Sequence, residues 1–227
     1  MKNESSYGKK FELLLKKIRQ RHRVELPELS PVDQLIVGFL EWNATARLAA
    51  KAHEQLMAEL VDNNDLRVSL PQELLALIGV KYPQGDERVL RLREVLNAVY
   101  VREHAMSLDS LAGKPKKQIR TYVEGLPGIT QYVAAQLMLL AFGVHAIPVD
   151  DHIAELLRAE ETVDPKASVQ EVAQFLERRV KAGDAAEVHR MLRIWTDGRM
   201  RRSAARAPRK KTARKKATVR TRASRKK

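Results

Sequence analysis

The segment QYVAAQLMLLAFG, residues 131–143, is apolar on nearly every side when its residues are arranged at helical spacing. A helix of this kind has no face that suits solvent, so it belongs at the centre of a folded body. Elsewhere Leu, Ala, Arg and Glu also recur at helical spacing, and no run alternates convincingly as a half-buried strand does. The sequence therefore predicts an all-α protein with this helix at its core.

The longest helical pattern in the first half of the chain follows Ser30 and Pro31. These residues supply a capping hydroxyl and a ring already set at helical φ. We expect the helix to run to about residue 60, with a break near Asn43, and to be ended by DNND, residues 62–65.

Further helices are predicted from the same kinds of signal. Ser168 and Glu171 match a capping box at the start of one of them. Others are expected at residues 11–20, 71–80, 86–105, 114–125 and 184–198. The total is roughly nine or ten helices, and a hydrophobic content of 44% is enough to build a real core for them.

The net charge of +14 is concentrated at one end of the chain. Residues 199–227 contain 15 of the 42 Lys and Arg and none of the 28 Asp and Glu, which leaves −1 for the preceding body. With almost nothing apolar to bury, residues 201–227 are predicted to form a disordered basic tail. Nucleic-acid phosphate is the favoured partner, because its neutralisation releases counterions; an anionic membrane surface or a solubility role are the alternatives. The clusters expected to contact phosphate are Arg209, Lys210, Lys211, Arg214, Lys215 and Lys216.

The chain has no cysteine, which excludes disulfides, a thiol nucleophile, thiolate zinc sites and cysteine-ligated iron–sulfur clusters. Its six histidines show no metal-ligand spacing, so no metal site is predicted. No stretch has the apolar length of a signal peptide or of a membrane span, which is about 18 residues. We therefore expect a cytoplasmic protein, nucleoid-associated if the source is bacterial.

A tight turn, LPGIT at residues 126–130, precedes the apolar helix. Pro127 prevents continuation of the preceding helix, and Gly128 permits a backbone approach that a Cβ would obstruct. The helix that starts near Gln131 then presents free backbone N–H groups, which suit a phosphate. Taken alone, the turn is more simply an ordinary connection between two helices.

The turn and the residues after it resemble the helix-hairpin-helix DNA glycosylase superfamily, the endonuclease III-like proteins of base excision repair. The family pattern is Leu-Pro-Gly-Val-Gly, a small residue, an apolar helix, then Val-Asp-x-His and an Arg. The matching residues here are Leu126, Pro127, Gly128, Ile129, Ala134, Val149, Asp150, His152 and, less closely in spacing, Arg158. Residues 30–45 and 188–199 also resemble family helices, so the likeness covers about residues 30–199.

This resemblance implies a two-lobed helical fold with a DNA cleft between the lobes. The central lobe would span residues 31–147, with the hairpin at about 115–143, and the second lobe would combine 1–30 with 148–200. In the family, the hairpin amides grip one DNA strand while the target nucleotide rotates out of the stack into a pocket. The residues implied to bind DNA are Leu126, Pro127, Gly128, Ile129, Thr130 and Gln131.

By the same resemblance, Asp150 lies at the mouth of that pocket as the catalytic carboxylate. There it would stabilise an oxocarbenium-like sugar or activate the attacking nucleophile. The sequence also suits Asp150 as the N-cap of the following helix, with Asp151 in its first turn, and the two roles are compatible. The other implied pocket residues are Asn43, facing the lesion, Glu41 as a second carboxylate, Trp42, stacking or in the core, and His152, orienting the loop.

The chain departs from the family pattern in three places. Tyr132 stands where bifunctional members have the lysine that forms a Schiff base, so β-elimination by that route is not expected and Tyr132 would line or fill the pocket. Thr130 replaces the second glycine of the hairpin, which is expected to weaken or alter the grip on phosphate unless its hydroxyl makes a contact of its own. The four-cysteine cluster loop is missing, so the basic tail would supply part of the DNA affinity.

Together these features predict a monofunctional DNA glycosylase that hydrolyses the N-glycosidic bond of a damaged or mismatched base in double-stranded DNA. Asp150 would be the key carboxylate, water the nucleophile, and no cofactor would be required. The alternative is a catalytically silent relative that recognises damaged or distorted duplex through the hairpin and the tail. A third possibility is lyase activity through a lysine from elsewhere in the chain. A monomer that does not engage a membrane is the simplest expectation.

Overall fold

The structure is a computed structural model that describes residues 4–21 and 28–206, and every regular element in these ranges is helical. The elements are α1 (Glu4–Arg19), α2 (Pro31–Glu41), α3 (Ala46–Glu59), α4 (Asn63–Val68), α5 (Pro71–Ile78), α6 (Gly85–Glu103), the 3-10 turn η1 (Asp109–Leu111), α7 (Lys116–Glu124), α8 (Gln131–Phe142), α9 (Asp151–Ala159), α10 (Val169–Arg179), the 3-10 turn η2 (Ala182–Asp184) and α11 (Ala185–Arg206). The all-α prediction is confirmed, with eleven α-helices in the described ranges rather than nine or ten.

Local capping signals fix several of these boundaries. The Ser30 hydroxyl accepts a hydrogen bond from Asp33 N at 3.1 Å, and Pro31 occupies the first turn of α2, as predicted. The predicted break after α2 is confirmed, because Asn43 adopts a positive φ of 50° and Thr45 then caps α3. The predicted capping box between Ser168 and Glu171 is also formed at the start of α10.

The role predicted for residues 62–65 is wrong. The helix α3 has already ended at Glu59, and the stretch begins a new helix, α4. The reason is the Asp62 carboxylate, which accepts hydrogen bonds from Asn64 N and Asp65 N, both at 2.8 Å. An acidic side chain in this position satisfies the free N–H groups of a helix start, so the same residues that end one helix can cap the next.

The basic tail was predicted to begin at residue 201, and this boundary is wrong. The helix α11 continues through Arg206, since Ala, Arg and Met are good helix formers and no Gly or Pro interrupts residues 199–206. Residues 207–227, and with them the six predicted phosphate contacts from Arg209 to Lys216, lie outside the described residues.

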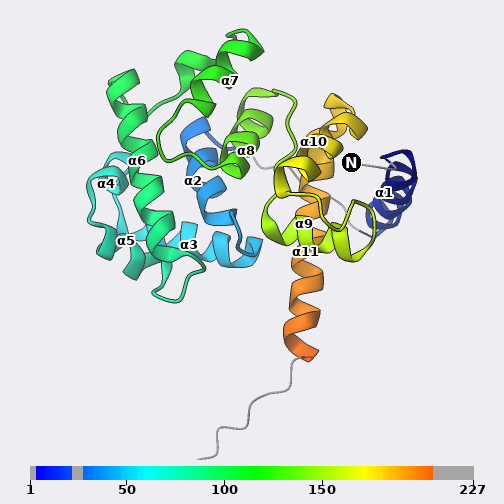
Figure 1. The fold of residues 1–227 in the computed structure, drawn as a ribbon. Helices are drawn as coiled ribbons and strands as arrows, with labels where there is room; N and C mark the ends of the chain where they lie inside the picture. Colours follow the sequence, from blue (N-terminus) through cyan, green and yellow to red (C-terminus); the bar gives the residue numbers. More distant parts are fainter. Residues whose placement is uncertain (1–3, 22–27, 207–227) are drawn as a thin grey trace, which may run out of the picture.

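The buried apolar side chains form two separate clusters. The first is built from α2 to α8 and extends to Ala146. The second combines α1 with the chain from Ile147 to Trp195, together with Leu139 at the end of α8. Figure 1 shows the same division, with α1, α9, α10 and α11 on one side and α2 to α7 on the other. The predicted two-lobed arrangement is confirmed, and the chain's first helix joins its last one.

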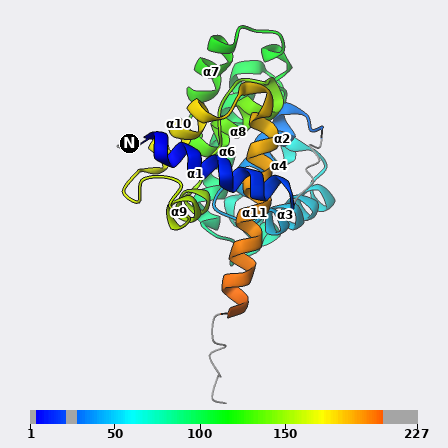
Figure 2. The same cartoon turned by 90° about the vertical axis from the view of Figure 1, so that its right-hand side faces the viewer.

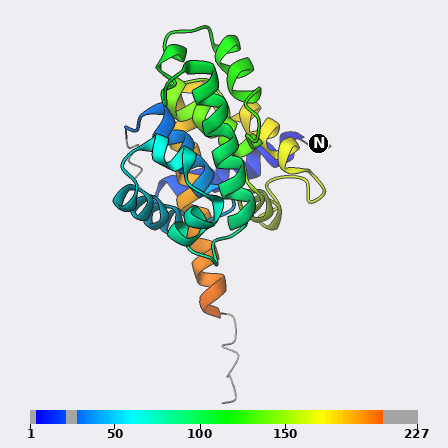
Figure 3. The same ribbon diagram turned by 90° about the vertical axis from the view of Figure 1, so that its left-hand side faces the viewer.

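The apolar helix α8 packs directly on α2 at the centre of the first lobe. Gly38 allows this close approach, because a Cβ there would lie 3.3 Å from Val133 Cγ1. Figure 2 shows α1 crossing α11 in the second lobe. In Figure 3, α4, α5 and α6 face the viewer, on the side of the first lobe that lies away from the second lobe. Of the helices in the described ranges, none is long and apolar enough to cross a membrane.

Candidate functional site

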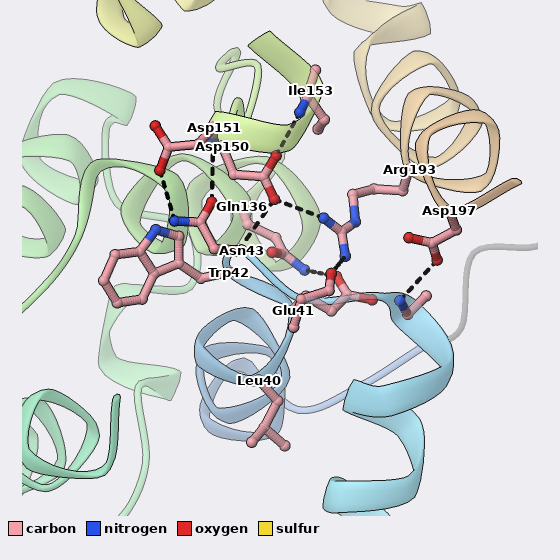
Figure 4. Close-up of polar contacts among 12 residues, drawn as sticks. Leu40, Glu41, Trp42, Asn43, Gln136, Asp150, Asp151, Ile153, Arg193 and Asp197 are labelled. Carbon is pink, nitrogen blue, oxygen red and sulfur yellow. Dashed lines mark hydrogen bonds and ion pairs between the residues drawn. The ribbon is translucent and has the colours of Figure 1, made fainter. Parts of the chain in front are cut away.

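Asp150 lies between the two lobes at the N-terminus of α9, and only 2% of its surface is exposed. Its Oδ1 atom accepts a hydrogen bond from Ile153 N at 2.9 Å, so the predicted N-cap is formed. Its Oδ2 atom accepts from Asn43 N at 3.2 Å and from Arg193 Nη1 at 2.8 Å (Figure 4). The carboxylate is therefore covered by three donors from three separate parts of the chain.

Arg193, in the middle of α11, is 1% exposed and links three elements. Besides its ion pair with Asp150, it donates to Ala44 O at 2.6 Å and stacks over the Tyr132 ring at 5.8 Å. Burial alone would lower the pKa of Arg193, but the acidic groups around it outweigh burial and raise that pKa above its ordinary value. The guanidinium is therefore a permanent positive charge at the junction of the lobes.

Asn43, for which a position facing the lesion was predicted, is buried and contacts the second lobe through Asp151. Its Nδ2 donates to Asp151 Oδ2 at 2.7 Å and to Gln84 Oε1 at 3.3 Å, and its Oδ1 accepts from Asp151 N at 3.1 Å. A further bond joins the same turn to α11, where Asp197 Oδ2 accepts from Ala46 N at 2.8 Å. The turn of residues 42–46 is thus tied to α9 and α11 on both sides of Asp150 (Figure 4).

Tyr132, which was predicted to line or fill the pocket, is buried in the core of the first lobe with 2% of its surface exposed. Its ring lies 6.1 Å from that of His189. Burial raises the pKa of Tyr132 well above its ordinary value, so the phenol is neutral. Burial also lowers the pKa of His189 well below its usual range, helped by Arg193 and Arg190. Both rings are therefore uncharged at neutral pH.

Several buried polar atoms in this region have no hydrogen-bond partner within the described part of the chain. They include Tyr132 Oη, Gln136 Oε1 and Arg193 Nε. Glu41, the second predicted carboxylate, is 4% exposed and accepts from Gln136 Nε2 at 2.7 Å and from Arg190 Nη1 at 3.1 Å. Because native interiors satisfy nearly all buried polar groups, the three atoms without partners indicate a place where a ligand or an ordered water would supply the missing hydrogen bonds.

Trp42 is half-buried and belongs to the first lobe's core. Arg88, fully buried beside it, lies 5.6 Å from the Trp42 ring and donates to Trp42 O, Phe39 O and Pro83 O. Burial lowers the pKa of Arg88 to about 10. By satisfying the last carbonyl groups of α2, this arginine fixes the end of the helix from which Glu41 and Asn43 project.

His152 and Arg158 are the remaining residues of the family pattern, and within the described part of the chain no hydrogen bond or ion pair joins either of them to Asp150. His152 is half-buried, and its Nδ1 is buried without a hydrogen-bond partner among the described residues. Arg158 donates through Nε and Nη2 to Ala167 O, at 3.0 and 2.8 Å, so it holds the loop between α9 and α10.

The hairpin of residues 126–131 lies at the surface, with Pro127 and Gln131 exposed. Gly128 has a φ of +77°, and a Cβ there would lie 2.6 Å from Glu94 Oε2 and 3.1 Å from Arg91 O, as its predicted close approach requires. Thr130 adopts an extended backbone, and its hydroxyl accepts from Val133 N at 3.2 Å. The hydroxyl predicted as a possible phosphate contact is thus the N-cap of α8.

A cavity of about 580 Å³ lies where the hairpin meets the segment that leads to Asp150. Thr130 and Gln131 line it on one side, Ile147 and Val149 on another, and Gln174 of α10 faces them. This is the position of the predicted cleft between the lobes. Neither Asp150 nor Tyr132 is part of its lining, although Val149, the neighbour of Asp150, is.

Sequence reasoning missed Arg193, Gln136 and Arg88. A signal for Arg193 was present, because His189, Arg193, Thr196 and Asp197 fall at helical spacing on one face of α11. All four are buried. A polar stripe on the side of a helix that faces a core indicates a functional interior. No such signal marks Gln136 and Arg88, because their burial depends on how their helices pack against α2.

Comparison by sequence finds no family model that matches the chain and no curated protein similar to it. Comparison of the fold finds solved structures that cover most of its length. A trapped endonuclease III–DNA covalent intermediate, in an estranged-adenine complex, is 20% identical, with a TM-score of 0.65 over 83% of this chain and 85% of that one. A thermostable thymine-DNA glycosylase is 19% identical, with a TM-score of 0.59 over 85% and 87%.

A third similar structure is a Clostridium acetobutylicum 8-oxoguanine glycosylase/lyase in complex with double-stranded DNA that contains cytosine opposite 8-oxoguanine. It is 13% identical, with a TM-score of 0.65 over 88% of this chain and 71% of that one. The chain therefore shares the helix-hairpin-helix glycosylase fold, and the resemblance read from its sequence is confirmed at the level of the fold.

Proposed function

We propose that this chain, which has the fold of base excision repair glycosylases, binds duplex DNA and hydrolyses the N-glycosidic bond of a damaged or mismatched base. The observation that carries the proposal is the group of buried polar atoms without partners beside Asp150. A site that binds a base needs hydrogen-bonding groups held ready in a dry interior, and Tyr132 Oη, Gln136 Oε1 and Arg193 Nε supply them.

DNA binding is assigned to the hairpin and its surroundings. The N-terminus of α8 lies at the surface next to the cavity, and a helix N-terminus suits a phosphate group. Thr130 caps this helix by accepting a hydrogen bond from Val133 N. The cavity lining also carries Glu124 and Glu177 against Arg120, so electrostatic attraction has to come from elsewhere, and the basic chain end is the candidate.

The chemistry is assigned to Asp150. Inside a DNA duplex the sugar carbon that reacts is shielded, so the nucleotide must leave the base stack before the N-glycosidic bond is cut. A fixed carboxylate beside that carbon stabilises the positive charge that develops on the sugar, or takes a proton from the attacking water. Because Asp150 is only 2% exposed in this structure, the site has to open before the sugar reaches this carboxylate.

Hydrolysis without strand cleavage follows from Tyr132. A neutral buried phenol cannot form an imine with the sugar, and hydrolysis by water needs no metal or organic cofactor. The nearby lysines, Lys114, Lys116 and Lys117, are exposed at the start of α7, in front of the hairpin. Sodium borohydride trapping on abasic DNA tests this assignment, because a trapped covalent complex would show that a lysine from elsewhere forms the imine.

A panel of duplexes that carry single lesions or mismatches tests the main proposal. After incubation, alkali cleaves the strand wherever a base has been lost, and electrophoresis measures the product. We expect release from at least one duplex and its loss in Asp150→Asn, with Asp109→Asn, an exposed carboxylate elsewhere, as the matched control. Release that survives in Asp150→Asn would contradict the role of this carboxylate.

The second candidate, a catalytically silent DNA-binding protein, is favoured by one specific observation. Asp150 and Arg193 form an ion pair with side-chain exposures of 0% and 2%, which closes the site to substrate. In that case the chain would bind a damaged duplex more tightly than an intact one but release no base from any member of the panel. The same panel, combined with a binding measurement, separates the two functions.

The contribution of the tail is testable by truncation after Arg206, which leaves α11 intact. If residues 207–227 bind phosphate, their deletion weakens DNA binding and flattens the dependence of log affinity on log salt concentration. The slope should fall by about 0.9 for each phosphate that the tail neutralises in the full chain. An unchanged salt slope would contradict a role for the tail in DNA binding.

A further inference from the structure

The ion pair between Asp150 and Arg193 has a geometry that packing alone does not require. Burying two charges is costly, and a buried pair is often no more stable than apolar side chains of the same volume. The polar neighbours of Arg193 on α11, His189 and Asp197, add to that cost, because burial raises the pKa of Asp197 and lowers that of His189. Stability is therefore a poor explanation for a cation at this position.

The contacts of Arg193 hold it in one orientation. Nη1 donates to Asp150 Oδ2, Nη2 donates to Ala44 O, and Cζ lies over the Tyr132 ring, 5.8 Å from its centre. Asn43 N is the second donor to Oδ2, so the lone pairs of that atom are both engaged. Oδ1 accepts from a single donor, Ile153 N, so its other lone pair is free toward the described residues.

We infer that Arg193 is a positioning residue for base removal: it holds the carboxylate of Asp150 by Oδ2, supplies its counter-charge in a buried site, and leaves Oδ1 as the oxygen that acts on the sugar or the water. This inference rests on the proposed glycosylase function. A guanidinium suits the task because it stays charged and can direct two donors at once, which an ammonium group cannot do with the same geometry.

Other charged and titratable groups face the pair from every neighbouring element. They are Glu41 of α2, Tyr82 before α6, Arg88 of α6, Tyr132 of α8, Asp151 of α9, and His189, Arg190 and Asp197 of α11. Glu41 has its own cation in Arg190, and Asp151 is bound by Asn43. Arg193 is thus the cation in direct contact with Asp150 among the described side chains, and its removal leaves that carboxylate buried without a counter-charge.

The test is the pH profile of single-turnover base release, on the best lesion from the panel, for the full chain and three variants. Arg193→Met removes the charge with little change of volume, Arg193→Lys keeps the charge but not the paired donors, and Arg178→Met removes an exposed arginine of α10. Binding to the same duplex is measured in parallel, so that a change in the rate is not mistaken for a change in affinity.

We expect Arg193→Met to move the acid limb of the profile upward by about 1 to 3 pH units, since an opposite charge in contact favours the ionised carboxylate by that amount. Arg193→Lys should keep the limb near its wild-type position while the rate falls at every pH. Arg178→Met should match the wild type. A role confined to packing would lower the amount of folded protein without moving the limb.

The possible outcomes distinguish the inference from the proposed function. If the wild type releases no base, the proposed function fails, and the inference fails with it. If the wild type is active but the profile of Arg193→Met is unchanged, the inference alone is overturned. Should Arg193→Met fail to fold, Arg193→Lys decides: a lower rate at unchanged affinity supports the inference, and a wild-type rate overturns it.

Discussion

The hairpin and the Asp150 centre each begin a helix with a capping side chain, yet they are built in different ways. Thr130 caps α8 at the surface, and its hydroxyl bonds to a residue three positions ahead. Asp150 caps α9 through the same spacing, but it is buried and also contacts Asn43, 107 positions away, and Arg193, 43 positions away. The hairpin cap depends on a local contact at the surface, whereas the Asp150 centre depends on long-range contacts and is buried.

The difference between the two caps should appear first in stability. Asp150→Ala leaves the buried Arg193 guanidinium without its partner, so we expect the free energy of unfolding to fall by about 3 to 5 kcal/mol. Urea denaturation followed by circular dichroism measures it. For comparison, Glu4→Ala, which breaks an exposed pair with Arg178, should cost far less, because solvent screens such a pair. Equal losses in the two variants would show that burial of the pair does not matter.

The hairpin should be most sensitive at Gly128. In Gly128→Ala a Cβ meets Arg91 O at 3.1 Å on a backbone with a φ of +77°. Such a conformation costs a residue with a side chain about 1 to 2 kcal/mol. We expect a loss of stability of this size and weaker DNA binding, with an unchanged rate of base release at saturating DNA. Wild-type DNA affinity in a folded Gly128→Ala protein would contradict the proposal that the hairpin binds DNA.

The buried His189 beside Tyr132 should also make the stability of the protein depend on pH. The folded protein holds His189 neutral, with its pKa depressed by burial, so its contribution to stability is complete above the unfolded pKa of 6.5 and is lost as the pH falls below that value. For one proton the slope is at most about 1.4 kcal/mol per pH unit. Denaturation at pH 7 and pH 5 should show a smaller difference for His189→Gln than for the wild type or for His104→Asn, an exposed control.

The smallest effect is expected at Thr130. Thr130→Ala removes the cap of α8 and leaves no buried charge behind, so the loss of stability should be about 1 kcal/mol. Thr130→Gly should lose only a few tenths, because glycine is tolerated at an N-cap. Thermal unfolding of the two variants measures both values. A loss from Thr130→Ala as large as that from Asp150→Ala would remove the distinction between the two caps.

Much of the local structure could be predicted from short stretches of sequence. Ser30 with Pro31, Ser168 with Glu171, and the apolar segment that became α8 all behave as predicted, because capping and helix periodicity depend on residues within a turn or two of each other. The prediction for residues 62–65 was wrong because a cluster of Asp and Asn is compatible both with the end of one helix and with the start of another.

The site was predictable in part. The resemblance brought Asp150, Tyr132, Asn43 and Glu41 into one region, and the structure places all four at the junction of the lobes. It did not predict that Asn43 would be bound to Asp151, since that contact depends on how the turn of residues 42–46 meets α9. The partner of Asp150 was missed because Arg193 is separated from it by the whole of α9 and α10.

The sequence by itself determined the helices, their caps, the sharp turn at Gly128 and the exclusion of cysteine chemistry, because each depends on neighbouring residues or on composition. Only the tertiary structure decided that Asp150 is buried, that a guanidinium from α11 faces it, and that polar atoms collect beside them. Burial and charge pairing depend on which distant parts of the chain come into contact when the two lobes pack, and no local sequence pattern specifies those contacts.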